Sequence, residues 1–401
     1  MSANKSNTNG ALAWAAVSIL ACAVSAAAFA APPSIERVGA VTIATFPDVQ
    51  PLSARDPVDY VNARPLPLPI ATSFSDAAAQ ADLIAALASP SARPASLPVF
   101  VRGSVGDGQA RPVFLGKPTG PVVGDEYAPQ EFGTSNHPFS TARADGFTGS
   151  TNQIYPFRAS GKVFFTKPGV AGTFTCSASL IKKGIVVTAA HCVSQFGANR
   201  FYTNFRFVPG YRNGSAPYGT WTDRSIHVPT AYLNGSTPCA QAGVVCRDDV
   251  AVVALAPQGG SLPGTSTGWY GYGYNNAGFT PSNQAHITQT GYPGCLDNGA
   301  IMQRNDSQGF KSPAHANNTL LGSLMCGGSS GGPWIVNFGK RPTLTGTTSG
   351  SSPQVNSVVG VTGWGSISTG PKQMGASPFL NTNIQNLVTA ACNANPAHCT
   401  S

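Results

Sequence analysis

A short glycine-rich loop carries a serine that could act as a nucleophile. The run Gly328-Ser329-Ser330-Gly331-Gly332-Pro333 places Ser330 among glycines, with Cys326 just upstream and the apolar run 334–336 after it. Glycines let backbone N–H groups turn toward one point and leave room for a substrate carbonyl beside the hydroxyl. The chain has 45 glycines, so the loop indicates catalysis only if the sequence also supplies a base and an acid.

One histidine lies in a context that would hold a general base. His191 ends the apolar run 186–190, and Cys192 follows it. A disulfide from Cys192 to Cys176 would fix the imidazole, and a general base has to be held in place. The alternative is a core histidine with a structural role. The other five histidines lie in polar or turn-like segments, where we expect them at the surface: His137, His227, His286, His315 and His398.

An aspartate at the mouth of an apolar strand could orient that base. Asp249 directly precedes the run 250–255, whereas we expect Asp248 to be its solvated neighbour. Residues 150–401 contain five aspartates and no glutamate, so this position is unusual. A carboxylate buried against an imidazole fixes its tautomer and stabilises the imidazolium. The alternative is that both aspartates simply begin a strand.

The N-terminus is typical of a signal peptide. Lys5 precedes an apolar run from Ala11 to about Ala23, and 28–30 is a small-residue cleavage pattern. The run is too short for a retained membrane span. An alternative, a bacterial lipoprotein site ending at Cys22, lacks the leucine expected at Ile19. We therefore predict a signal peptide over 1–30 and a secreted protein, extracellular or periplasmic, that is free of the membrane after signal removal.

Eight cysteines remain after the signal, an even number that favours disulfides in an exported chain. No Cys-x2-Cys pair is present, so we predict no zinc site, and we find no cofactor motif. A calcium site built from loop carbonyls stays open. Proximity in the sequence suggests the pairs Cys176–Cys192, Cys239–Cys246, Cys295–Cys326 and Cys392–Cys399.

The composition favours turn-rich β structure, with 45 Gly, 33 Pro and 42% hydrophobic residues but only 10% charged ones. Short apolar runs, such as 161–165, 173–181 and 184–188, alternate with turns and not with helices, which disfavours a parallel α/β sheet. One helix is predicted near the C-terminus, where apolar residues fall at helical spacing: Ile384, Leu387, Val388 and Ala391.

Residues 31–150 contain no cysteine and are rich in proline and alanine near their start. We interpret this segment as a propeptide, with a boundary between about 130 and 157. The first 149 residues carry 9 Lys+Arg and 11 Asp+Glu, whereas 150–401 carry 15 and 5. No basic run is longer than Lys182-Lys183, so we expect no nucleic-acid partner. Alternating prolines over 65–69 predict an extended chain, 75–88 a helix and 103–149 a loop region.

Three motifs now point to one family. Thr-Ala-Ala-His-Cys ends at Cys192, Asp-Val-Ala-Val begins at Asp249, and Gly-Ser-Ser-Gly-Gly-Pro begins at Gly328. In this order they resemble the chymotrypsin-like (trypsin-fold) serine endopeptidases over about 155–390, and not α/β-hydrolases or subtilisins. The segment 290–294 resembles the bacterial glutamyl-endopeptidase-like branch. The segment 361–365 resembles the strand that pairs with substrate and walls the specificity pocket.

The resemblance implies an all-β fold of two antiparallel Greek-key six-stranded β-barrels with a short C-terminal helix. Barrel 1 would span about 155–258, barrel 2 about 265–382 and the helix about 383–392, within a protease domain over 151–401. Ser330 would be the nucleophile, His191 the base and then the acid, and Asp249 the group that orients it. The backbone N–H groups of Gly328 and Ser330 would form the oxyanion hole. We expect protein or peptide substrates and a monomer.

The expected pocket departs from the family's charged forms. Leu324, beside Met325, stands where the trypsin branch has an aspartate that selects basic side chains. Thr362 stands where the glutamyl branch has a histidine. Gly365 leaves the mouth open, and Gly363 and Trp364 complete the expected wall. We therefore favour an apolar or small uncharged side chain, although a chain without glutamate after residue 149 keeps Glu cleavage open.

The residue before the nucleophile bears on how the enzyme would be activated. Ser329 precedes the nucleophile, where the trypsin branch has an aspartate that receives the freed N-terminal amine. Because a serine carries no charge, we expect the propeptide to act by assisting folding or by covering the cleft. The leading function is a secreted serine endopeptidase made as a preproprotein. The alternative is a catalytically silent secreted binding protein on the same fold, and an esterase conflicts with the motif order.

Overall fold

The computed structural model describes residues 1–2, 32–46, 58–71, 78, 81–82, 84–85, 97–119, 131–132, 137–145, 149–339, 354–366 and 372–400. Residues Pro32–Ser401 form one compact unit. The expected signal peptide and most of the helix expected over 75–88 lie outside the described residues, although the five residues described in that stretch are helical. No described helix combines the length and the apolar character that spanning a bilayer requires.

Six antiparallel strands close into a first barrel, because β16 pairs with β19 as well as with β14. The apolar runs found in the sequence at 161–165, 173–181 and 184–188 lie in the first three of these strands. Every residue of β11 and β19 is buried, as expected for a strand whose neighbours cover both faces. The six strands are β9 (Ser160–Lys167), β10 (Val170–Lys182), β11 (Ile185–Thr188), β14 (Thr203–Pro209), β16 (Trp221–Pro229) and β19 (Ala251–Leu255).

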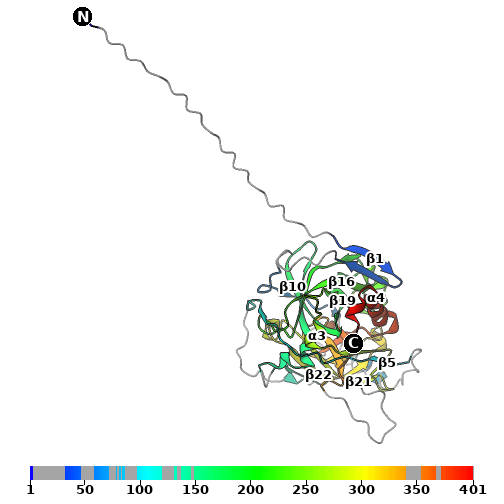
Figure 1. Ribbon diagram of the computed structural model, residues 1–401. Helices are drawn as coiled ribbons and strands as arrows, with labels where there is room; N and C mark the ends of the chain where they lie inside the picture. Colours follow the sequence, from blue (N-terminus) through cyan, green and yellow to red (C-terminus); the bar gives the residue numbers. More distant parts are fainter. Residues whose placement is uncertain are drawn as a thin grey trace. The chain divides into compact units, whose positions relative to one another are not determined.

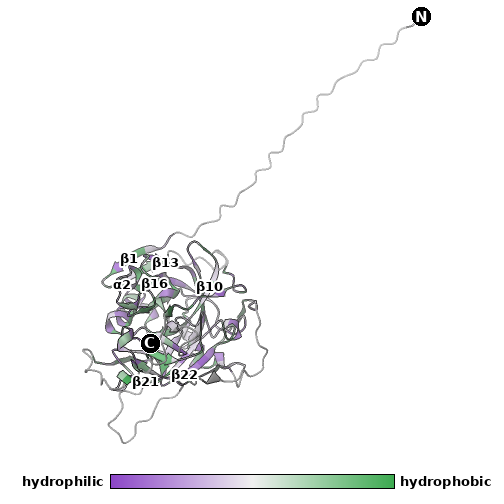
Figure 2. Ribbon diagram, turned by 180° about the vertical axis from the view of Figure 1, so that it is seen from behind, coloured by the Kyte–Doolittle hydropathy of each residue, from purple (hydrophilic) through white to green (hydrophobic). Residues whose placement is uncertain are grey.

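A second set of six antiparallel strands closes in the same way, because β21 pairs with both β22 and β24. Figures 1 and 2 show this set, marked by β21 and β22, apart from the first set, marked by β10 and β16. The expectation of two closed six-stranded antiparallel barrels is confirmed. The strands are β21 (Gln284–Gly291), β22 (Gln303–Lys311), β23 (Thr319–Gly322), β24 (Pro333–Val336), β25 (Ser357–Ser366) and β26 (Gln373–Ala376).

The C-terminal helix forms where its apolar spacing predicts. A π-helical turn, η7 (Asn381–Gln385), leads into α4 (Asn386–Ala394), and the four residues of the predicted stripe are buried. The helix packs against β16 and β19 of the first barrel, as Figure 1 also shows. Shorter elements connect the strands: β12 (Ser194–Gln195), β13 (Arg200–Phe201), β15 (Ser215–Ala216), α2 (Thr230–Leu233), β17 (Cys239–Gln241), β18 (Val245–Cys246), α3 (Gly264–Thr267) and β20 (Gly271–Tyr274).

The segment before residue 150 is not a separate layer, because its strands extend the sheets of both barrels. The hairpin β1 (Ser34–Val38) and β2 (Val41–Thr45) pairs through β2 with β16 of the first barrel. Strand β5 (Val99–Val101) pairs with β20 in the sheet of the second barrel, whereas β6 (Val113–Phe114) pairs with β15 in a separate two-stranded sheet.

The prediction of a loop over 103–149 is wrong where strands form, at β6 and in a longer stretch that joins the second barrel. Strand β8 (Phe139–Arg143) pairs with five residues of β22 in the second barrel, and β7 (Glu131–Phe132) pairs with β8. Residues 139–143 alternate between buried and half-buried, and Arg143 forms an ion pair with Asp297. The serine, threonine and arginine of this strand hide its pattern from a reading based on apolar runs.

Candidate active site

The pairing of β11 with β19 brings His191 and Asp249 together. Thr188, the last residue of β11, lies opposite Ala251, the first residue of β19. The residues just beyond these two positions therefore meet at the same edge of the first barrel. His191 sits in a single turn of 3-10 helix after β11, and the Cys176–Cys192 disulfide ties that turn to β10.

Asp249 holds His191 by two hydrogen bonds. The imidazole Nδ1 donates to Asp249 Oδ2 at 2.8 Å, and the backbone N–H of His191 donates to Oδ1 at 3.0 Å. Because a carboxylate only accepts, Nδ1 carries the proton of this bond, and Nε2 is the nitrogen left to act as a base. The backbone N–H of Asp249 donates to Ser377 Oγ at 3.0 Å, which fixes the aspartate in turn.

Asp248, expected to be solvated, is buried instead. Its carboxylate accepts hydrogen bonds from Thr237 Oγ1 at 2.6 Å and from Arg247 at 2.9 Å, and Asn383 Nδ2 lies 3.3 Å from it. These partners come from the loop before the aspartates and from the C-terminal helical turn. Asp248 therefore ties the loop before β19 to the C-terminal helical turn, whereas Asp249 faces the imidazole.

The buried charge of Asp249 also acts on a neighbouring tyrosine. Burial, with the Asp249 carboxylate as a second cause, raises the pKa of Tyr202 to about 12. Tyr202 thus stays a neutral phenol over the range in which a histidine base works. The negative charge nearest to His191 is the one on Asp249.

The loop of Ser330 is held by both barrels. The backbone N–H of Ser177, on β10, donates to Ser330 O at 2.7 Å, and Gly331 N–H donates to Thr362 O on β25 at 2.7 Å. A Cβ added at Gly331, where φ is +77°, would lie 2.9 Å from Ala189 N, two residues before His191. Only a glycine fits this close approach, which places the serine loop against the turn of the histidine.

Two atoms suited to proton transfer lie here without protein partners. Among the described residues, His191 Nε2 and Ser330 Oγ are buried side-chain atoms with no hydrogen-bond partner. The exposed fraction is 8% for His191 and 0% for Ser330. Such unpaired polar atoms are costly in a folded protein and call for a functional reason. His191 also lies near the sulfurs of Cys176 and Cys192, but these are joined in a disulfide and offer no thiolate.

The four disulfides join the pairs that proximity in the sequence suggested. Besides Cys176–Cys192 they are Cys239–Cys246, Cys295–Cys326 and Cys392–Cys399. The Cys295–Cys326 bridge links the loop after β21 to the segment that leads into the serine loop. It therefore holds the chain on either side of the expected pocket.

An extended segment of the N-terminal region lies across this site, and we call residues Arg64–Ala71 the strap. It enters beside β10 as β3 (Arg64–Pro65) and leaves beside β25 as β4 (Ile70–Ala71), running parallel to both strands. Between these ends, Leu66 N–H donates to Thr175 O at 2.9 Å. The backbone N–H of Gly328 donates to Leu66 O at 3.0 Å. The strap thus occupies a donor that the sequence assigned to the oxyanion hole.

Most of the expected pocket residues lie near the site, but Thr362 bonds to side chains inside the second barrel. Met325 and Trp364 are buried, Leu324 is half-buried, and Gly363 lies so close to Asp249 that an added Cβ would be 3.3 Å from Oδ2. The Thr362 hydroxyl accepts hydrogen bonds from Gln289 Nε2 at 2.8 Å and from Trp334 Nε1 at 2.9 Å. Its donors are side chains of the second barrel, so Thr362 belongs to an internal network.

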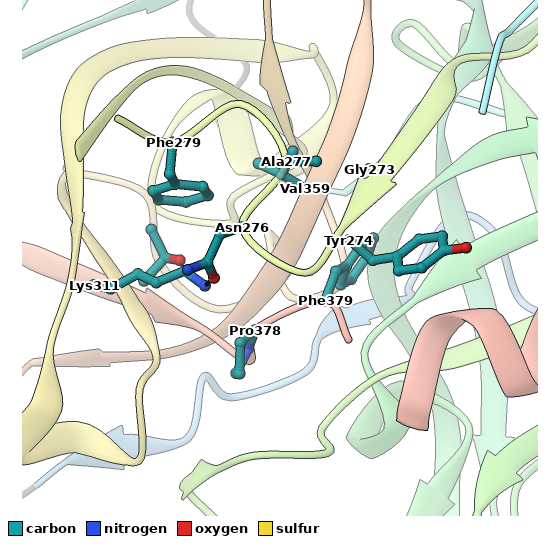
Figure 3. A pocket seen from close by; sticks show the side chains of 10 residues that line it. Gly273, Tyr274, Asn276, Ala277, Phe279, Lys311, Val359, Pro378 and Phe379 are labelled. Atoms are coloured by element: carbon teal, nitrogen blue, oxygen red, sulfur yellow. Dashed lines mark hydrogen bonds between the residues drawn. The ribbon is translucent and has the colours of Figure 1, made fainter. Parts of the chain in front are cut away.

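A separate hollow lies in the second barrel and contains none of these residues. Figure 3 shows Lys311 reaching toward Asn276, with Phe279 beside it. The ammonium group donates a hydrogen bond to Asn276 Oδ1 and lies 5.0 Å from the centroid of the Phe279 ring. Burial lowers the pKa of Lys311 to about 8. The amide and the ring are therefore the partners of this cation.

The family model named Trypsin matches residues 147–389, which is more than half of the chain. The chain belongs to the trypsin family. The order His191, Asp249, Ser330 and the two six-stranded barrels agree with this assignment, and the chain is classed with the serine-type endopeptidases. The matched region begins after β8, so the strap and the β1–β2 hairpin lie outside it.

Individual relatives of this trypsin-family chain are distant. The protease Anisep from Arthrobacter nicotinovorans is 26% identical, with a TM-score of 0.46, over 59% of this chain and 96% of that one. The thermostable serine protease AL20 from an extremophilic microorganism is 23% identical, with a TM-score of 0.45, over 58% and 97%. A Glu endopeptidase is 17% identical, with a TM-score of 0.44, over 68% and 100%.

A curated relative matches a shorter region. The extracellular metalloprotease of Bacillus subtilis (strain 168) is 24% identical over 144 residues, which is 36% of this chain and 41% of the relative. The chain therefore spans less than half the length of this relative.

Several residues of the site were not found from the sequence. Ser377, which holds Asp249, and Gln289, which holds Thr362, carry no local motif. The strap did leave a signal, because its alternating prolines predicted an extended chain. Nothing in that pattern indicated where the chain would lie.

Proposed function

We propose that this trypsin-family chain is a secreted serine endopeptidase, made as a latent precursor, that hydrolyses peptide bonds through Ser330, His191 and Asp249. One observation carries the proposal. The imidazole of His191 is held by the Asp249 carboxylate at Nδ1, while its Nε2 and the hydroxyl of Ser330 are buried without partners among the described residues. The fixed Nδ1 leaves Nε2 as the nitrogen that can accept the serine proton. The hydrogen bond between Nε2 and Ser330 Oγ is not formed in this structure, and we propose that it forms in the active enzyme.

The reaction follows from these groups. His191 Nε2 takes the proton of Ser330 as Oγ bonds to the substrate carbonyl carbon. The backbone N–H groups of Gly328 and Ser330 stabilise the resulting oxyanion, and the loss of one such donor typically costs about 10²–10³ in turnover. His191 then gives its proton to the departing amine as the C–N bond breaks. A water molecule, deprotonated by His191, hydrolyses the acyl-enzyme and restores Ser330.

The strap supports the latent form of this proposal. It takes the N–H of Gly328 through Leu66 O, and Ser330 is fully buried in this form. We expected the propeptide either to assist folding or to cover the cleft. The contacts of the strap support the second role. A substrate carbonyl needs the same donor, so the two compete and substrate binding requires the strap to leave.

The layout proposed from the sequence is a signal peptide over 1–30, a propeptide over 31–150 and a protease domain over 151–401, with a boundary between 130 and 157. Strand β8 favours a junction before His137. Its removal would unpair the edge of β22 and leave Asp297 without Arg143. His137 itself donates to Gln308 O at 2.6 Å. The four disulfides support an oxidising compartment, in agreement with secretion.

Labelling with a fluorophosphonate probe tests the proposal. The processed protein should label rapidly, the precursor slowly, and Ser330→Ala not at all. His191→Ala should abolish labelling, and Thr290→Ala, in the neighbouring strand β21, serves as a folded control. A processed protein that does not label at Ser330 would favour the silent binding protein. Sequencing the processed N-terminus then places the junction.

A further inference from the structure

The strap places a leucine side chain between the two walls expected for the specificity pocket. A Cβ added at Gly365 would lie 2.5 Å from Leu68 Cδ2, and a Cβ added at Gly327 would lie 3.3 Å from Leu68 N. Gly365 belongs to the wall 361–365, and Gly327 follows the wall 324–326. Leu68 is therefore seated where a substrate side chain would enter.

The surface beneath Leu68 is apolar. Leu68 packs against a buried hydrophobic cluster of the second barrel. Met325 comes from the segment before Ser330 and Met374 from β26, so two flexible thioethers contribute to the cluster. The nine buried members are Ala285, Ile287, Leu321, Met325, Trp334, Val336, Val359, Met374 and Ala376.

The polar groups near this cluster satisfy one another. Ser323 Oγ donates to Gln289 Oε1 at 2.8 Å, and Gln289 Nε2 donates to Thr362 Oγ1 at 2.8 Å. Thr362 stands where the glutamyl branch has a histidine, and here its hydroxyl is occupied. A charged substrate side chain would lose its hydration without gaining an ionic partner from these groups.

We propose that the pocket selects a leucine-sized apolar side chain, so that the enzyme cleaves after leucine or methionine, and that Met325 sets this preference. The inference rests on the proposed peptidase function and adds its substrate class. Leu68 indicates this preference because its side chain lies next to Gly365 and packs against the cluster that contains Met325. The open alternative of cleavage after glutamate is disfavoured by the same contacts.

The strap fills the pocket without being arranged as a substrate. In a substrate, the residue whose side chain enters the pocket also places its own carbonyl in the oxyanion hole. Here the side chain belongs to Leu68, whereas the carbonyl bonded to Gly328 belongs to Leu66. Both leucines also precede a proline, whose nitrogen carries no hydrogen. The strap therefore fills the pocket with a side chain, but it does not place the carbonyl of that same residue in the oxyanion hole for attack by Ser330.

Peptide p-nitroanilides that differ only in the residue before the cleaved bond test this inference on the processed enzyme. The kcat/KM for Leu and Met should exceed that for Glu and Arg by roughly 100-fold, because the cluster beneath Leu68 is apolar and the polar side chains Ser323, Gln289 and Thr362 are already paired. Met325→Asp should raise Arg relative to Leu at least tenfold. Met325→Ala, a milder change, should move the preference toward Phe. Met302→Ala, which truncates a methionine of another cluster, should keep the leucine preference.

Fluorophosphonate labelling of each variant separates the possible failures. A variant or parent enzyme that labels at Ser330 but prefers Glu or Arg overturns this inference and leaves the proposed function standing. The same holds if Met302→Ala changes the preference as much as Met325→Ala does. A processed enzyme with no Ser330-dependent labelling overturns both.

Discussion

The N-terminal segment attaches to the two barrels in contrasting ways. On the first barrel, β2 pairs with β16 over five residues, and Val41, Ile43 and Ala44 join the main hydrophobic core. At the active site, the strap pairs over only two residues with β10 and two with β25. The hairpin attaches through a ladder with a buried apolar face. The strap buries Leu66 in the same core and packs Leu68 against the second barrel, but it also occupies backbone groups that a substrate needs.

This difference suggests that the hairpin attaches the N-terminal segment, whereas the strap inhibits the active site. A five-residue antiparallel ladder with a buried face provides affinity wherever it lies. A strap of alternating prolines has few N–H groups to pair, and one of those few, on Leu66, bonds to β10. The hairpin can therefore hold the segment in place while the weaker strap competes locally with substrate, as expected of a tethered inhibitor.

Replacing the whole strap, residues 64–71, with Gly and Ser of equal length should give the largest change. Labelling of the precursor should accelerate roughly 10³-fold, because a site that is open about 0.1% of the time becomes open throughout. The rate of fluorophosphonate labelling, before any processing, is the measurement. If the changed precursor labels as slowly as the original, the strap does not inhibit and the comparison fails.

Shortening a side chain of the hairpin should affect stability but not latency. Ile43 is 6% exposed and lies in the main core, so Ile43→Ala should lower the free energy of unfolding by about 3 kcal/mol. Thermal or urea unfolding of the precursor, carrying Ser330→Ala to prevent processing, measures this loss. Labelling of the active form should stay as slow as in the parent; a fast rate would mean that the hairpin, too, inhibits.

The contrast also explains what could be predicted from the sequence. The segments of His191, Asp249 and Ser330 are short motifs next to apolar strands, and the strands themselves fix how they meet. The nearest cysteines in the sequence form the disulfides. These features are local, so composition and spacing predict them.

Burial that arises from distant segments could not be predicted in this way. Four of the five histidines expected at the surface are buried: His137, His227, His315 and His398. Gln373, more than 200 residues away, donates to His137 Nδ1 at 2.9 Å, and β2 covers the strand of His227. Asp248 is buried for the same reason. A polar residue in a polar local sequence is expected at the surface, but its burial depends on segments that are distant in the sequence.

Truncating the strap's leucine should weaken inhibition by a smaller amount than removing the strap. Leu68→Ala removes the side chain from the pocket but keeps the hydrogen bond between Leu66 O and Gly328. Labelling of the precursor should accelerate about tenfold, which corresponds to about 1.4 kcal/mol of lost burial. Exposed Leu97, outside the strap, supplies the matched control Leu97→Ala, which should not change the rate. Equal acceleration in both variants would show that the pocket contact is unimportant.

The smallest effect should come from a histidine beneath the hairpin. His227 lies opposite Ile43 in the pairing of β16 with β2, and burial lowers its pKa to about 4. The unfolded chain, with a pKa near 6.5, binds the proton first on acidification. The folded state therefore loses stability as the pH falls from 6.5 toward 4.

Between pH 7 and pH 6 this loss should be on the order of 1 kcal/mol. His137, whose pKa burial also lowers to about 4, adds a similar slope from the second barrel. The His227→Gln precursor should lose the part due to His227 and keep the parts due to His137 and to His398, whose pKa burial also lowers. Thermal unfolding across this pH range measures the difference. Cleavage that releases the hairpin uncovers His227 and moves its pKa back toward 6.5, so the processed form should lose less stability in acid. An equal acid sensitivity in precursor and processed form would place the burial of His227 in the barrel alone.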